Sequence, residues 1–134
     1  MGLMRRKAEH IDFGFLAAAI KSNPRAVPSN VDAMMERRGR FLAMEFKKPN
    51  EDFGEGQKIF LRALAKKPDT TVWIVTGHFD REPVEFDSAH ILLPSSRLRL
   101  LTDEFEKLVE ALNIWHDAPE VYRELYETDR KEPT

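Results

Sequence analysis

The chain has 134 residues, of which 42% are hydrophobic and 33% charged, a composition typical of one globular domain rather than a disordered chain. It contains no cysteine, which excludes disulfides, thiolate zinc sites and a cysteine nucleophile. Residues 1–7 include three basic side chains, but no long apolar segment follows them. The apolar segment at residues 17–20 is too short to cross a bilayer. We therefore expect a cytoplasmic protein without membrane contact.

The net charge of −2 divides unevenly along the chain. Residues 1–70 hold 14 Lys and Arg against 9 Asp and Glu, a net +5, whereas residues 71–134 hold 7 against 14, a net −7. Local positive potential attracts phosphate backbones, so the basic half favours a nucleic-acid partner. The alternative is a solvated surface with a chance imbalance.

The first half of the chain predicts a helix followed by a β-hairpin. Residues 8–22 carry apolar side chains at helical spacing, and a segment with two prolines ends this helix. Residues 30–36 and 41–47 are expected to form paired strands, joined by a turn in which Gly39 suits a positive φ. Pro49 ends the second strand because it lacks the N–H that a central strand needs.

A second helix is predicted over residues 53–66, starting near Asp52 and Glu55, which have capping-box spacing. The unbroken apolar run at residues 71–76 predicts a strand that is buried on both faces. Residues 82–94 are expected to be extended or irregular.

The C-terminal part predicts two helices, at residues 102–115 and from about residue 117 to Tyr126. We expect these acidic helices to cover the other face of the sheet or to form a dimer contact. Trp73 and Trp115 are expected in the core. The predicted class is α/β, with a central mixed β-sheet flanked by helices and with C-terminal helices.

Four residues around the predicted hairpin form the most informative pattern: Asp32, Glu45, Lys47 and Gln57. Because strand side chains alternate between faces, Glu45 and Lys47 project one way and Phe46 the other. Two carboxylates and an ammonium can surround one Mg²⁺, a hard cation that prefers oxygen ligands and serves phosphodiester hydrolysis. The alternatives are an ordinary exposed strand pair, an aspartate that merely begins a strand, and a solvent-facing glutamine.

This order of motifs resembles the PD-(D/E)XK nuclease superfamily, most closely its compact virus-type replication-repair nucleases, phage nucleases and junction resolvases. The resemblance covers about residues 8–77. It implies an αβββαβ core of restriction-endonuclease type within one domain at residues 1–134, followed by a helical extension at about residues 95–128.

The resemblance also implies roles for single residues. Asp32 and Glu45 would bind Mg²⁺, with Mn²⁺ as a substitute, and the main-chain carbonyl of Phe46 would complete the coordination. Lys47 would position or activate the attacking water, and Gln57 would support the metal or water network.

The chain departs from the family pattern at two places. Val31 precedes Asp32 where many relatives carry proline. Many relatives also place an acidic residue on the first helix, and Glu9 or Asp12 is the candidate here, with nothing in the sequence to decide between them.

Basic residues near the constellation are candidate contacts to a nucleic-acid backbone. They are Arg37, Arg38, Arg40, Lys48 and Lys58. The alternative for the three arginines is a polar hairpin tip.

The predicted function is a metal-dependent endonuclease that hydrolyses DNA by water attack, with a homodimer as a candidate assembly that addresses two strands or a junction. The alternative is a non-catalytic module on the same fold that binds nucleic acid or protein, for example a phage regulatory factor. A small acidic interaction protein that uses residues 102–128 is the third hypothesis.

Overall fold

The computed structural model describes residues 13–16, 18–19, 21–23 and 31–128. The chain forms two compact units, Met1–Asn30 and Val31–Thr134, and each is described by itself. Of the helices in these described ranges, none has the length and apolarity that a membrane crossing requires.

The first unit does not contain the continuous α-helix predicted over residues 8–22. Phe13–Leu16 forms a short 3₁₀ helix, and Ala18 has a φ of 66°, a left-handed conformation that an α-helix of L-residues does not tolerate. The remainder of the predicted helix lies outside the described residues.

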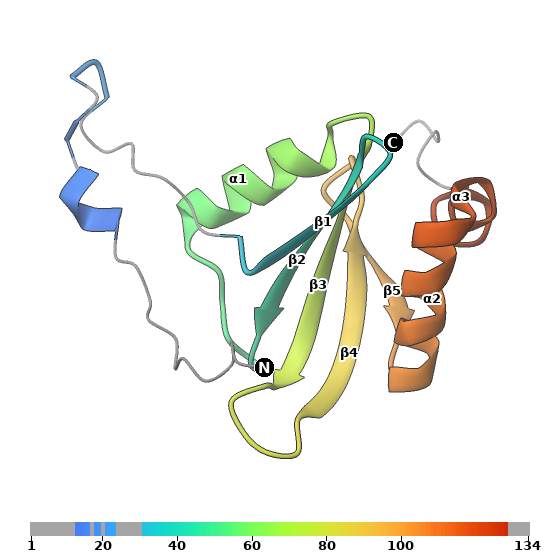
Figure 1. Cartoon of the computed structure of the whole chain (residues 1–134). Helices are drawn as coiled ribbons and strands as arrows, with labels where there is room; N and C mark the ends of the chain where they lie inside the picture. Colours follow the sequence, from blue (N-terminus) through green and yellow to red (C-terminus); the bar gives the residue numbers. More distant parts are fainter. Residues whose placement is uncertain (1–12, 17, 20, 24–30, 129–134) are drawn as a thin grey trace. The chain divides into compact units, whose positions relative to one another are not determined.

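The second unit is built on a five-stranded sheet with the strand order β1-β2-β3-β4-β5 (Figure 1). β2 and β3 are parallel and all other neighbours are antiparallel, so the predicted α/β class with a mixed sheet is confirmed. The strands are β1 (Ala33–Arg37), β2 (Arg40–Lys47), β3 (Thr70–His78), β4 (Glu85–Leu92) and β5 (Leu98–Thr102).

The β1–β2 hairpin has the tight turn that the sequence predicts. Arg37 pairs with Arg40, and the two loop residues between them, Arg38 and Gly39, have φ values of 54° and 81°. Two positive φ values in a two-residue loop are typical of a type I′ turn, which matches the twist of antiparallel strands. Glu36 Oε2 accepts a hydrogen bond of 2.8 Å from the Gly39 N–H and supports the turn.

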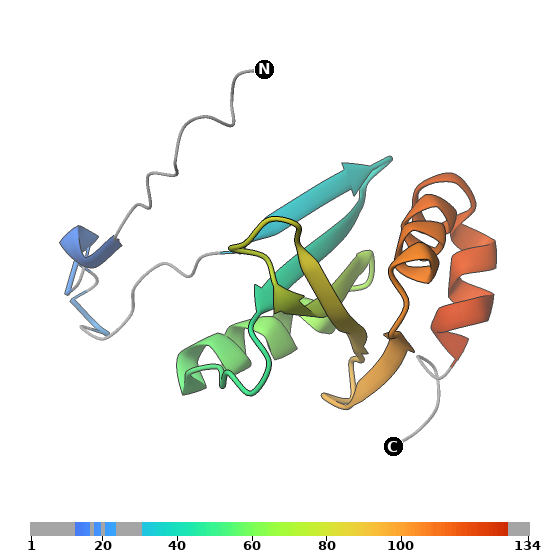
Figure 2. The same cartoon turned by 90° about the horizontal axis from the view of Figure 1, so that it is seen from below.

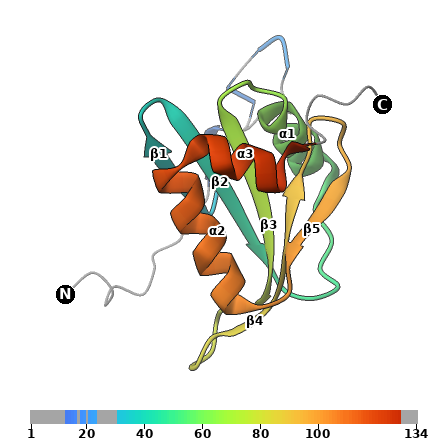
Figure 3. The ribbon, with the colours of Figure 1, turned by 90° about the vertical axis from the view of Figure 1, so that its right-hand side faces the viewer.

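Helices cover both faces of the sheet. α1 (Glu55–Ala65) lies on one face, here called the α1 face, while α2 (Phe105–Asp117) and α3 (Pro119–Tyr126) lie on the other, the α2 face (Figures 1 and 2). Figure 3 shows α2 and α3 crossing in front of the sheet, so the predicted cover by the C-terminal helices is confirmed.

Each face has its own hydrophobic core. Leu61 and Ala65 of α1 pack with Val72 and Ile74, whereas the α2-face core contains Trp73 and Trp115 along with Tyr122. The two tryptophans are 0% and 2% exposed, as predicted for core residues. β3 alternates between the two cores, which explains its unbroken apolar run.

β4 and β5 extend the sheet beyond what the sequence predicts. β4 lies within the stretch expected to be extended or irregular, and β5 was not expected. The chain order of the second unit is therefore β-β-α-β-β-β-α-α, with two strands before α1 where the order αβββαβ has three. The β3–β4 register shifts at Gly77, where a Cβ atom would collide with the carbonyl oxygen of Glu85.

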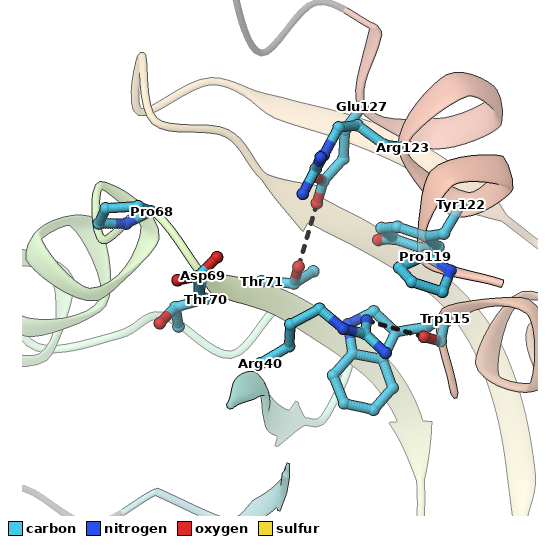
Figure 4. Close-up of a pocket in the computed structure, with 10 residues that line it drawn as sticks. All are labelled: Arg40, Pro68, Asp69, Thr70, Thr71, Trp115, Pro119, Tyr122, Arg123 and Glu127. Atoms are coloured by element: carbon cyan, nitrogen blue, oxygen red, sulfur yellow. Dashed lines mark hydrogen bonds between the residues drawn. The ribbon is translucent and has the colours of Figure 1, made fainter. Parts of the chain in front are cut away.

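Arg40 joins the sheet to the C-terminal helices (Figure 4). Its guanidinium donates hydrogen bonds to the main-chain oxygens of Trp115 (2.9 Å) and His116 (3.4 Å) and lies 4.7 Å from the centroid of the Trp115 ring. These oxygens end α2, where the helix dipole favours a cation. Nearby, Thr71 donates a hydrogen bond of 3.2 Å to the buried carboxylate of Glu127. The hollow between them measures about 20 Å³, room for about one water molecule.

Replacing Arg40 with methionine should lower the free energy of unfolding by about 2 kcal/mol, because two charge-assisted hydrogen bonds and a ring contact are lost. Urea unfolding followed by tryptophan fluorescence measures this loss. Arg97→Met removes an exposed arginine and is the matched control, expected to change stability by less than about 0.5 kcal/mol. Equal stabilities of the two variants would contradict the anchoring role of Arg40.

Candidate functional site

Asp32, Glu45 and Lys47 come together on the α1 face. Glu45 pairs with Ile74, a member of the α1-face core, so strand alternation places both Glu45 and Lys47 on this face. Ala33 pairs with Met44, and the same register continued by one residue places Asp32 opposite Glu45. The three groups are therefore not divided between the two faces of the sheet.

Asp32 is held by the neighbouring strand. Its Oδ2 accepts a hydrogen bond of 2.8 Å from the main-chain N–H of Phe46. This contact fixes the carboxylate beside β2 while the residue stays exposed to solvent. The hairpin register thus positions a carboxylate that a ligand can reach.

Glu45 is a buried carboxyl group with only one of its oxygens satisfied. The residue is 5% exposed, and its Oε2 accepts a hydrogen bond of 2.7 Å from Gln57 Nε2. Oε1 is buried and has no hydrogen-bond partner in the described part of the chain. A buried polar group without a hydrogen bond lowers the stability of the folded state by about 1–3 kcal/mol. A proton or a cation bound to this oxygen would remove that cost.

The environment of Glu45 raises its pKa from 4.5 to about 7. Burial is the largest cause, because it disfavours the charged form, and the nearby negative charge of Asp32 is the second. The main chain at Asp32 and, to a smaller extent, the hydrogen bond from Gln57 act in the opposite direction and favour the carboxylate. A carboxyl group that titrates near neutrality beside a second carboxylate is typical of a functional site.

Lys47 lies at the end of β2, where the following loop holds its ammonium. Nζ donates a hydrogen bond of 2.8 Å to the main-chain oxygen of Glu51 and lies 5.0 Å from the centroid of the Phe53 ring. An ammonium has three donors, so this one bond leaves two for a ligand.

α1 presents Gln57 to the sheet because Gln57 lies one helical turn before Leu61, which is buried in the α1-face core. The predicted capping box at Asp52 and Glu55 is wrong. Gly54 is the N-cap, and no side chain caps the helix there. Gln57 is thus in the first turn of α1, on the face where Glu45 lies.

The basic residues predicted to contact a nucleic-acid backbone do not lie together at the site. Arg37 and Arg38 lie at the hairpin tip, about 20 Å along β2 from Lys47. Arg40 is engaged at the end of α2, a structural contact that the sequence did not indicate. Lys48 lies at the site end of β2 and forms an exposed ion pair of 3.3 Å with Asp80, while Lys58 follows Gln57 on α1.

His90 also lies near the site, although the sequence gives this histidine no metal-motif spacing. It pairs with Ile74, which pairs with Glu45, so the three form a row across the α1 face. Burial lowers the pKa of His90, and the charge of Lys47 lowers it further. Recognising β4 as a strand on this face would have revealed it.

The donor set available to a cation consists of oxygens. The ranges that the structure describes hold no cluster of three or more His, Cys, Asp or Glu residues able to bind a metal ion. Asp32 and Glu45 supply two carboxylates, and Glu9 and Asp12 lie outside the described residues. Two carboxylates plus water are a usual number of protein ligands for Mg²⁺.

Comparisons of the chain with protein-family models, with curated proteins and with solved structures returned no significant match.

The raised pKa of Glu45 predicts a pH-dependent stability of the metal-free protein. The folded state holds this proton up to about pH 7 and the unfolded chain up to about pH 4.5. The stabilisation is therefore complete below pH 4.5 and is lost as the pH rises through 7. Between about pH 4 and pH 8 the loss should reach about 3 kcal/mol.

Urea unfolding in chelator at a series of pH values tests this expectation. Glu45→Gln should remove the loss, because the amide oxygen still accepts from Gln57 but carries no charge. Glu124→Gln, on the exposed surface of α3, is the matched control and should follow the wild type. The same pH dependence in all three proteins would show that Glu45 is not perturbed.

Proposed function

We propose that the protein is a divalent-metal-dependent deoxyribonuclease of the PD-(D/E)XK type, acting as an endonuclease. The observation that carries the proposal is the buried Glu45 carboxyl, with one oxygen unpartnered among the described residues and Asp32 opposite. Lys47 and Gln57 lie on the α1 face with Glu45, as expected from the resemblance of the sequence motifs to this superfamily.

The residues present suit a hard divalent cation. The free oxygen of Glu45 and the exposed carboxylate of Asp32 would hold Mg²⁺, with the Phe46 carbonyl as the further ligand that the family resemblance implies. When bound, the ion supplies Lewis-acid polarisation of a phosphate oxygen and a lowered pKa of bound water. A positive charge here would also remove the repulsion between the two carboxylates.

The side chains have separate tasks in hydrolysis. A water oxygen forms a bond to phosphorus, the phosphodiester P–O bond breaks, and the leaving oxygen receives a proton while the water loses one. Lys47 uses its free N–H donors to orient the attacking water and to stabilise charge on the phosphate. Gln57 keeps Glu45 in place, so it is a positioning residue.

The charge distribution supports an approach of DNA to the α1 face. Lys47, Lys58 and Arg62 belong to this side, on β2 and α1. The C-terminal helices on the α2 face carry Glu106, Glu110 and Glu120 among their acidic residues. A phosphate backbone is attracted to the first side and repelled by the second.

Incubation with supercoiled, linear, single-stranded and branched DNA tests the proposal. Cleavage should require Mg²⁺ or Mn²⁺ and stop in chelator. Asp32→Asn, Glu45→Gln and Lys47→Met should each lower the cleavage rate by at least about 100-fold, because each removes a ligand or a group that stabilises transition-state charge.

Metal titration by calorimetry separates the roles of these residues. Asp32→Asn and Glu45→Gln should weaken Mn²⁺ binding, whereas Lys47→Met should bind it as the wild type does. Lys107→Met, on the exposed side of α2, is the control and should retain full cleavage. Binding of DNA without cleavage of any substrate, and without metal binding, would support the non-catalytic module instead.

A further inference from the structure

An open groove lies beside the candidate site on the α1 face. α1 forms one side, and Leu92 and Leu98 of β4 and β5 form the other. Phe53 and Ile74 also line it, and its volume is about 140 Å³, where one water needs about 10–15 Å³. The groove therefore has room for a planar ring rather than for one or two waters.

The rim of the groove is cationic. Lys58 and Arg62 line it from α1, one helical turn apart, so they lie on the same side of the helix. Neither side chain forms an ion pair or a hydrogen bond with another described residue, and no carboxylate of the described chain lines the groove. An apolar floor with an unpaired cationic rim is complementary to a ligand with a flat apolar body and an anionic backbone.

The groove lies close to the carboxylates of Asp32 and Glu45. Ile74, which lines the groove, is the register partner of Glu45, and adjacent strands are about 4.8 Å apart. Phe53 also lines the groove, and the centroid of its ring lies 5.0 Å from the ammonium of Lys47. A group bound in the groove is therefore a close neighbour of a phosphate at Asp32 and Glu45.

We propose that this groove binds an unpaired nucleobase of the strand whose phosphate lies at the carboxylate pair, an inference that rests on the proposed function. Base stacking on an aromatic ring such as that of Phe53 stabilises single-stranded nucleic acid without reading its sequence. Lys58 and Arg62 hold the adjoining phosphates. A base inside a duplex is stacked and paired and does not enter the groove unless it is extruded.

The substrate class that follows is single-stranded or locally unpaired DNA. Leu98 offers the sharpest test because its side chain is 57% exposed, so a substitution there leaves the core intact. Leu98→Glu places a carboxylate in the groove. Leu125→Glu is the matched control, since Leu125 is 58% exposed and lies on α3, on the other face.

The first measurement uses the full chain in chelator, so that no cleavage is needed. A single-stranded oligonucleotide with one 2-aminopurine should change its fluorescence on binding, and the same probe paired in a duplex should not. Leu98→Glu should bind the single-stranded probe at least about tenfold more weakly than Leu125→Glu. Lys58→Met and Arg62→Met should also weaken it, relative to Lys107→Met. Equal affinities of Leu98→Glu and Leu125→Glu would overturn the proposal.

Cleavage assays keep this proposal distinct from the nuclease proposal. With metal present, Leu98→Glu should lose at least about tenfold in cleavage of unpaired DNA while its Mn²⁺ affinity stays at the wild-type value. Metal-dependent cleavage that depends on Asp32 but not on Leu98, with no preference for unpaired DNA, overturns the groove alone. Fluorescence changes that depend on Leu98, without cleavage of any substrate, leave the groove in place and overturn the nuclease.

Discussion

The buried carboxyl group of Glu45 is the constraint on which the candidate site depends. Burial and the neighbouring Asp32 both oppose its charge, and only one of its oxygens is bonded among the described residues. A bound proton or cation stabilises such a group. An apolar residue at position 45 would not carry the cost of a buried charge. A carboxyl group at such a position is the pattern expected of a functional site.

The two faces of the sheet have different roles: the α2 face stabilises the fold, and the α1 face holds the candidate site. On the α2 face, Arg40 and Trp115 fix the C-terminal helices to the sheet, and the tryptophans fill the core. On the α1 face, the tight hairpin brings Asp32 beside β2, and the crossover through α1 brings Gln57 to Glu45. On this face the helix packs against Leu92 of β4 but leaves Leu98 of β5 exposed, and the groove lies between them. One backbone crossover therefore creates both the carboxylate site and its neighbouring groove.

Local patterns in the sequence predicted the hairpin, α1 and β3, because Gly39, Pro49 and the apolar run at residues 71–76 act over short distances. The same patterns placed Asp32, Glu45 and Lys47 on one face. They missed β5 because its apolar side chains Leu98 and Leu100 are exposed and its alternation does not reflect burial. The anchoring role of Arg40 was missed because its partners lie 75 and 76 residues away, and a hairpin arginine carries no local sign of such a contact. The groove was missed as well, because its lining residues come from α1, β3, β4 and β5, which lie far apart in the sequence.

The most direct test of the central claim is a crystal structure of the full chain with Mn²⁺, with anomalous scattering used to locate the ion. The account predicts one anomalous peak bonded to an oxygen of Glu45 and an oxygen of Asp32, with the Gln57 hydrogen bond to Glu45 retained. An empty position between the two carboxylates at a saturating concentration of the ion, with Glu45 still bonded only to Gln57, would contradict it.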